Sequence, residues 1–127
     1  MHFHLITNDE RRAFESEWRA AEMAADERWN RLAGGYAVDV RTLYALSTSS
    51  SGAGQIAGDL LRALHRKSGS IELFELRHLD ADNLAAALRL IDCAASPSII
   101  PDAGLTAGPE GEPLLTAGQV AALVGDT

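Results

Sequence analysis

The chain has 127 residues, of which 46% are hydrophobic, and a formal net charge of −7 at pH 7. Its length suits one domain with an ordinary hydrophobic core, and its single cysteine, Cys93, excludes a disulfide within the chain. The acidic balance argues against general nucleic-acid binding, because such binding depends on Lys and Arg side chains that neutralise phosphates.

Charge is distributed unevenly along the chain. Residues 1–33 carry 7 acids and 5 bases, residues 34–97 carry 7 acids and 6 bases, and residues 98–127 carry 4 acids and no base. This distribution favours a soluble protein, or one that meets a partner with a basic surface. The first residues lack a basic region, and no stretch approaches about 18 apolar residues. We therefore expect a cytoplasmic protein with no signal peptide and no membrane segment.

The first long element is predicted to be a helix that begins after Thr7 or Asn8. Alternating polar and apolar residues at 2–6 suggest a short edge strand before it. Apolar residues then recur at spacings of three and four and form one stripe, at Phe14, Trp18, Ala21, Ala25, Trp29 and Leu32. The pair Gly34-Gly35 is predicted to end this helix, and the stripe is predicted to pack on the rest of the domain.

Further helices are predicted by caps and apolar spacing. Asp39 can cap a second helix, residues 48–54 read as a loop, and a third helix ends near Lys67, with Gly69 at its stop. The spacing of the apolar residues in segment 70–79 favours a short helix over a strand. Asp80 or Asp82 caps the next helix, which Pro97 ends.

The last part of the chain is predicted to contain one strand, one loop and one helix. Residues 98–100 suit a short strand, and residues 101–113, rich in Gly and Pro, read as an exposed loop. Thr116 and Gln119 form a capping box before a final helix. The fold class is therefore mainly α: a compact single domain, 1–127, of about five helices with minor β content.

A glycine-rich segment at 51–58 has two interpretations. If residues 41–46 and 71–75 were strands, the segment could hold a nucleotide phosphate at a helix N-terminus, with Glu72 or Glu75 on the ribose. The last glycine, however, comes one residue later than in the Gly-x-Gly-x-x-Gly motif of dinucleotide-binding folds. No further strand–helix unit follows. A flexible loop between helices is the preferred interpretation, and whether the segment has any ligand is left open.

Two features bear on DNA binding. The second and third helices could form a helix-turn-helix, but the N-terminal half of the third helix, where bases are usually contacted, is nearly featureless. The tail at 114–125 resembles the first helix of an excisionase-like or MerR-like DNA-binding module. Those modules need a second, recognition helix, so we expect no DNA-binding function to carry over.

No catalytic residue, cofactor-binding residue or metal ligand is predicted. His2 and His4 could share one face of a strand, but structural zinc needs four ligands. Cys93 has no CxxC partner and is predicted to be a small core residue. No Ser-His-Asp or paired-carboxylate arrangement follows from the spacing, so a non-enzymatic protein that needs no cofactor is expected.

Residues 43–92 resemble an uncharacterised family of small proteins from bacterial plasmids, integrative elements and phages. The matching features are Ser51-Gly52, then Ile56-Ala57 and Leu60-Leu61, the segment 69–76 and the closing Leu79-Asp80. The family has tryptophans after the paired leucines, where this chain has Arg62, Ala63 and Leu64. The resemblance implies a shared helical fold and a mobile-element context, and it implies no activity.

The predicted function is a non-enzymatic protein-binding factor from a mobile genetic element, for example an inhibitor of a host nucleic-acid-binding complex of the anti-CRISPR type. The alternatives are a DNA-associated accessory regulator and a nucleotide-binding enzyme. A small acidic protein can occupy a basic channel by charge complementarity. The acids predicted to meet such a partner are Glu15, Glu22, Asp26, Glu72, Glu75, Glu110 and Glu112. The partner's identity and the oligomeric state do not follow from the sequence.

Overall fold

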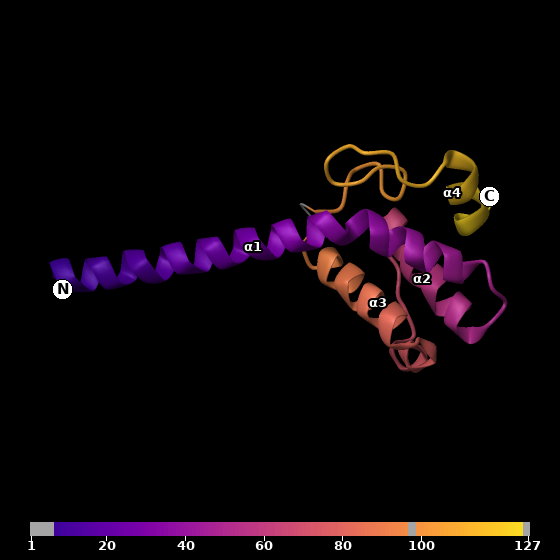
Figure 1. Cartoon of the computed structure of the whole chain (residues 1–127), viewed down its shortest axis with the longest axis horizontal. Helices are drawn as coiled ribbons and strands as arrows, with labels where there is room; N and C mark the ends of the chain where they lie inside the picture. Colours follow the sequence, from indigo (N-terminus) through magenta and orange to yellow (C-terminus); the bar gives the residue numbers. More distant parts are fainter. Residues whose placement is uncertain (1–6, 97–98, 126–127) are drawn as a thin grey trace. The chain divides into compact units, whose positions relative to one another are not determined.

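A computed structural model describes residues 7–96 and 99–125 of the chain. The described residues form four α-helices, α1 (Asn8–Ser47), α2 (Gly52–Arg66), α3 (Ala81–Ala94) and α4 (Ala117–Val124), and one 3₁₀ helix, η1 (Leu73–His78) (Figure 1). Their β structure is limited to one isolated bridge between Ala107 and Pro113. The predicted mainly α fold class is confirmed.

Contacts within the chain divide it into two units, Met1–Arg31 and Leu32–Thr127. The helix α1 runs through both, because its first 24 residues, 8–31, belong to the first unit and its last 16, 32–47, to the second. The buried apolar residues of the described chain all belong to the second unit. Within that unit α2 is the central helix and packs against η1, α3 and α4.

The helix α1 does not stop where the sequence predicted. It continues through Gly34-Gly35, and Asp39, predicted as the cap of a second helix, lies inside it. Each glycine costs a helix about 1 kcal/mol, whereas a fully buried Leu or Val side chain contributes about 1.5–3 kcal/mol. Because Leu32, Val40 and Leu43 are all buried, core packing outweighs the two glycines.

Capping residues set the ends of α2. Ser51 is its N-cap and accepts a hydrogen bond from the amide of Gly54 through its side-chain oxygen (3.1 Å). Lys67 is the C-cap and has the left-handed backbone conformation, with φ of 55°. The predicted loop at 48–54 placed the start of this helix at residue 55, three residues later than the structure does. The helix ends near Lys67, as predicted.

The segment from η1 to α3 follows the sequence closely. Residues 73–78 form a short 3₁₀ helix, as the preference for a helix over a strand predicted. Asp80 caps α3 by accepting from the amide of Asn83 (2.9 Å). The helix α3 ends at Ala94, and Pro97, its predicted stop, lies outside the described residues.

The Gly/Pro-rich segment 101–113 is only partly an exposed loop. Leu105 is fully buried, and its amide donates to Nδ1 of His65 (3.3 Å). The hydroxyl of Tyr36 donates to the carbonyl of Gly104 (3.4 Å), and Arg41 donates to the carbonyl of Pro113 (3.0 Å). The segment is therefore a structured part of the second unit, because it contributes core and hydrogen-bond partners to α1 and α2.

The elements around this segment include one further correction. Ile99 and Ile100 form a turn and a bend, so the strand predicted at 98–100 is wrong for the two of its residues that are described. The edge strand predicted at 2–6 lies outside the described residues. The capping box is confirmed, because Thr116 and Gln119 exchange side-chain and backbone hydrogen bonds of 2.9 and 3.1 Å at the start of α4.

Candidate protein-interaction surface

The exposed apolar stripe of residues 8–31 is the main candidate for a functional surface. Phe14 and Trp18 are 69% and 58% exposed, and Ala21 and Ala25, on the same face of the helix, are exposed as well. The prediction that Trp18 is a core residue is wrong, and Trp29 is only half-buried. We name the face formed by Phe14, Trp18, Ala21 and Ala25 the exposed stripe.

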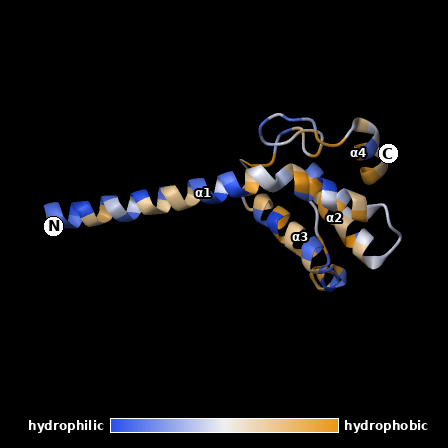
Figure 2. Ribbon diagram, in the orientation of Figure 1, coloured by the Kyte–Doolittle hydropathy of each residue, from blue (hydrophilic) through white to orange (hydrophobic). Residues whose placement is uncertain are grey.

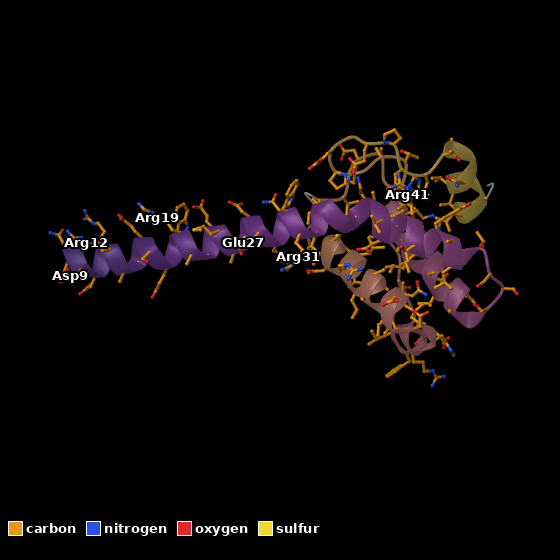
Figure 3. All side chains as sticks on the ribbon, viewed as in Figure 1. Asp9, Arg12, Arg19, Glu27, Arg31 and Arg41 are labelled. Carbon is orange, nitrogen blue, oxygen red and sulfur yellow. The ribbon has the colours of Figure 1, made fainter. Side chains whose placement is uncertain are left out.

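A line of carboxylates borders this stripe. Glu15, Glu22 and Asp26 are exposed and lie seven and four residues apart, so they share one side of α1 next to the apolar face. We name these three residues the acidic edge. Arg12 and Arg19, which Figure 3 labels, line one hollow of the helix surface together with Glu15, so arginines border the acidic edge. Three of the seven acids predicted to meet a partner are thus brought together beside exposed aromatic residues.

Two more of the predicted acids meet in the second unit. Glu72 and Glu75 line a shallow pocket of about 370 Å³ with Asp59, beside the N-terminal turns of α2. Two of these carboxylates already have partners, because Asp59 pairs with Arg62 and Glu75 lies 2.9 Å from Nε2 of His78. These contacts leave fewer carboxylate oxygens that the pocket can offer to a partner.

The remaining two predicted acids lie at the tip of the 101–113 segment. Glu110 is exposed. A carboxylate oxygen of Glu112 accepts from the amide of Glu110 (3.0 Å), and its backbone carbonyl accepts from the amide of Gly108 (2.7 Å). Glu112 therefore shapes the turn that presents Glu110.

Gly54, within the glycine-rich segment 51–58, serves helix packing. A Cβ on Gly54 would lie 2.8 Å from the backbone oxygen of Leu46 and would also contact the backbone oxygen of Ser49. The glycine therefore lets the start of α2 approach the end of α1. Residues 41–46 are helical and residues 73–78 form η1, so the strands on which the nucleotide interpretation depends are not formed there.

The basic end of α2 is used inside the second unit. Arg62 donates to the carbonyl of Leu123 (3.1 Å), and Arg66 donates to the carbonyl of Val124 (3.0 Å). Both carbonyls belong to the last turn of α4, where cations are favourable. The helix α2 also packs against η1 and α3.

The sequence did not reveal one apolar groove of the second unit. Its volume is about 450 Å³, and its lining includes Leu60 and Leu64 of α2, Ile91 of α3, Ile100 and the segment 67–71. Residues from four parts of the chain up to 40 positions apart meet there, so no local pattern could have indicated it. Lys67 stands at this groove and pairs with Asp102 at 3.5 Å.

The polarity of the two units differs along the chain. In Figure 2 the first part of α1 is largely hydrophilic with moderately hydrophobic turns, whereas α2 and α4 carry strongly hydrophobic segments. Within residues 7–96 and 99–125, no helix is long and apolar enough to cross a membrane. Over the same residues, no three His, Cys, Asp or Glu side chains are grouped so that they could hold a metal ion, and His2 and His4 lie outside them.

Cys93 is 1% exposed on α3, which confirms the prediction of a small core residue. Tyr36 on α1 is fully buried. Phe74 on η1 is 76% exposed, more than Phe14 or Trp18. Comparison with models of protein families, with curated proteins and with solved structures found no match for this chain.

Proposed function

We propose that this protein is a non-enzymatic protein-binding factor that acts in the cytoplasm and binds a partner with a basic surface. The observation that supports this function is the exposed stripe, where Phe14 and Trp18 lie on one face of α1 next to the acidic edge. Aromatic anchors surrounded by charged residues are typical of protein-binding surfaces, in which Trp is enriched among the residues that dominate affinity.

The more specific proposal is that the protein belongs to a mobile genetic element and inhibits a host nucleic-acid-binding complex, as an anti-CRISPR-type protein does. Its support is the resemblance of residues 43–92 to small mobile-element proteins and the net charge of −7. Carboxylates at Glu15, Glu22 and Asp26 can occupy a surface whose Lys and Arg side chains otherwise bind phosphates.

Site-specific photocrosslinking in the native host tests the proposed surface. A photoreactive amino acid replaces Trp18 in one variant and Glu27 in the control. The two positions are nine residues apart and therefore lie on opposite sides of α1. We expect one host protein to crosslink at position 18 and not at position 27, through a peptide rich in Lys and Arg.

Salt dependence of the identified complex is the second part of the test. Charge complementarity predicts that association slows as salt rises, because the screening length falls from about 30 Å at 0.01 M to about 8 Å at 0.15 M. Charge reversal of the acidic edge at Glu15, Glu22 and Asp26 should slow it further at low salt. Equal crosslinking at both positions, or an association rate that does not change with salt, would contradict the proposal.

A further inference from the structure

Apolar residues of α1 recur with an 11-residue period that runs through both units. Each repeat contains three apolar positions with steps of four and three residues, and the next repeat begins four residues later. The three repeats are Phe14, Trp18 and Ala21; Ala25, Trp29 and Leu32; and Tyr36, Val40 and Leu43. An 11-residue repeat corresponds to about 3.67 residues per turn, so the three repeats occupy one continuous face of the helix.

In the third repeat, other parts of the same unit cover this face. Tyr36, Val40 and Leu43 have no exposed surface. On α3, Cys93 lies close enough to Tyr36 to help raise the pKa of its hydroxyl, and Arg89 binds Asp39.

The pair of Asp39 and Arg89 links α3 to one flank of this face. Arg89 donates from Nε and from a terminal nitrogen to the two oxygens of the Asp39 carboxylate, at 2.8 and 2.9 Å. Asp39 flanks the apolar face, as do the positions that precede it by 22 and 11 residues, Glu17 and Arg28. In the first repeat the apolar spacing is the same, and Glu17 takes the place of Asp39 on the flank opposite the acidic edge.

We propose that the exposed stripe binds an α-helix of another protein, with apolar residues at matching spacing and Lys or Arg on the side that faces the acidic edge. This inference rests on the proposed function and specifies the partner's contact element. Ala21 and Ala25 lie between the bulky Trp18 and Trp29, so they leave room for a helix at the interaxial distance of about 8–10 Å.

Charge argues against an antiparallel second copy of this chain as the occupant. In an antiparallel pair of identical helices, each edge faces the same edge of the other helix. Glu15, Glu22 and Asp26 would then face one another, and such like-charge contacts are unfavourable. A basic helix meets this edge with opposite charge.

Synthetic helical peptides are the probe for this proposal. The test peptide has two repeats of about 11 residues, with leucines at the 4-3-4 spacing and lysines on both flanks. One control peptide carries glutamates on the flanks, and a second has the basic composition in scrambled order. Binding to the full chain is measured by fluorescence anisotropy. We expect the basic striped peptide to bind at least about tenfold more tightly than either control. Equal binding of the scrambled peptide, or no binding of the striped one, would overturn the proposal.

Variants of the full chain locate the binding and separate the two hypotheses. Ala25→Glu places a charge inside the exposed stripe, whereas Ala20→Glu places it on the far side of the same helix. We expect a loss of at least about tenfold in peptide affinity for the first and less than about twofold for the second. If the peptide binds but Ala25→Glu leaves its affinity unchanged, the stripe is not the binding surface, and the further inference and the surface proposed for function both fail.

A steric pair tests the helix itself. Changing Ala21 and Ala25 to Phe adds apolar area but blocks the close approach of a helix. Weaker peptide binding supports the proposal. Unchanged or tighter binding overturns the helix inference, although the proposed protein-binding function stands. Sedimentation of the chain alone as a dimer, abolished by Ala25→Glu, would assign the stripe to a second copy instead.

Discussion

The two parts of α1 carry the same apolar repeat in opposite environments. In residues 8–31 the stripe includes Phe14 and Trp18, which are mostly exposed, whereas in residues 32–47 it includes Tyr36 and Val40, which are fully buried. The difference shows that an amphipathic pattern establishes which face of a helix is apolar, but not what covers it. One repeat serves the core, and its continuation is available to a partner.

The largest expected effect comes from a substitution in the buried part of α1. Leu43→Ala should lower the free energy of unfolding by about 2–5 kcal/mol, because it leaves a cavity at a fully buried position. Trp18→Ala should change it by less than about 0.5 kcal/mol, since that side chain is 58% exposed. Urea titrations monitored by circular dichroism measure both. Equal losses in the two variants would mean that both parts of the stripe are covered.

The second prediction concerns the closest approach of the two helices that precede η1. Gly54→Ala should lower the free energy of unfolding by about 3 kcal/mol, because the new Cβ meets the backbone oxygens of Leu46 and Ser49. Gly118→Ala in α4 is a suitable control, because the only atom near its Cβ is a side-chain oxygen at 3.9 Å. Similar stability of both variants would contradict the tight packing of α2 on the end of α1.

The third prediction concerns the buried hydroxyl of Tyr36. Burial, and to a smaller extent Cys93, raises the pKa of Tyr36 from 10.0 to about 12. The folded state thus favours the neutral phenol. Its contribution, at most about 2.7 kcal/mol, is fully present below pH 10 and is lost as the pH rises through about 12.

Unfolding curves at about pH 8 and about pH 11 measure this contribution. Tyr36→Phe should lose less stability over this interval than the unaltered protein, whereas the control Tyr44→Phe should lose as much. An identical pH dependence for Tyr36→Phe and the unaltered protein would show that Tyr36 does not carry the effect.

The fourth prediction removes the ion pair beside the covered repeat. Arg89→Ala should cost about 2 kcal/mol, because the buried carboxylate of Asp39 loses two charged hydrogen bonds. The cost should stay below the 3–5 kcal/mol typical of a broken buried pair, since Arg89 is half-exposed. Arg12→Ala, in the exposed part of α1, should cost less than about 0.5 kcal/mol. The double variant Asp39→Asn, Arg89→Ala should be less destabilised than the sum of its single changes.

The smallest expected effect is a stabilisation inside α1. Gly34→Ala should raise the free energy of unfolding by about 0.5–1 kcal/mol, because the helix continues through this position and nothing lies within 4 Å of the new Cβ. Thermal unfolding of the variant measures the gain. A loss of stability would support the original interpretation that the helix ends at this glycine pair.

Local chemistry was sufficient to predict several elements. The caps at Asp80 and Thr116, the short helix before α3 and the buried Cys93 each follow from residues within a few positions of one another. The end of α1 was misjudged because glycines were weighed by local propensity alone. The 11-residue repeat continues past Gly34 and would have indicated the longer helix.

Other features depend on contacts between distant parts of the chain. Asp39 looked like a cap because its partner Arg89 is 50 residues away, and the sequence gives no sign of that contact. The sequence could not indicate that Trp18 is exposed, because the spacing of apolar residues in a helix is the same whether or not another element covers them. Among the predicted acids, Glu15, Glu22 and Asp26 share an edge because of helical spacing alone, whereas the placement of Glu72 and Glu75 depends on the packing of η1 beside α2.

The two arginines that bind the end of α4 also bear on the order of folding. The helix α4 has 8 residues, too few to be stable by itself in water, and its last carbonyls depend on Arg62 and Arg66, which lie 61 and 58 residues earlier. Closing so long a segment costs chain entropy before these bonds can form. We therefore expect α4 to dock late, after α2 has formed, so that changes at Leu123 accelerate unfolding and leave the folding rate nearly unaltered.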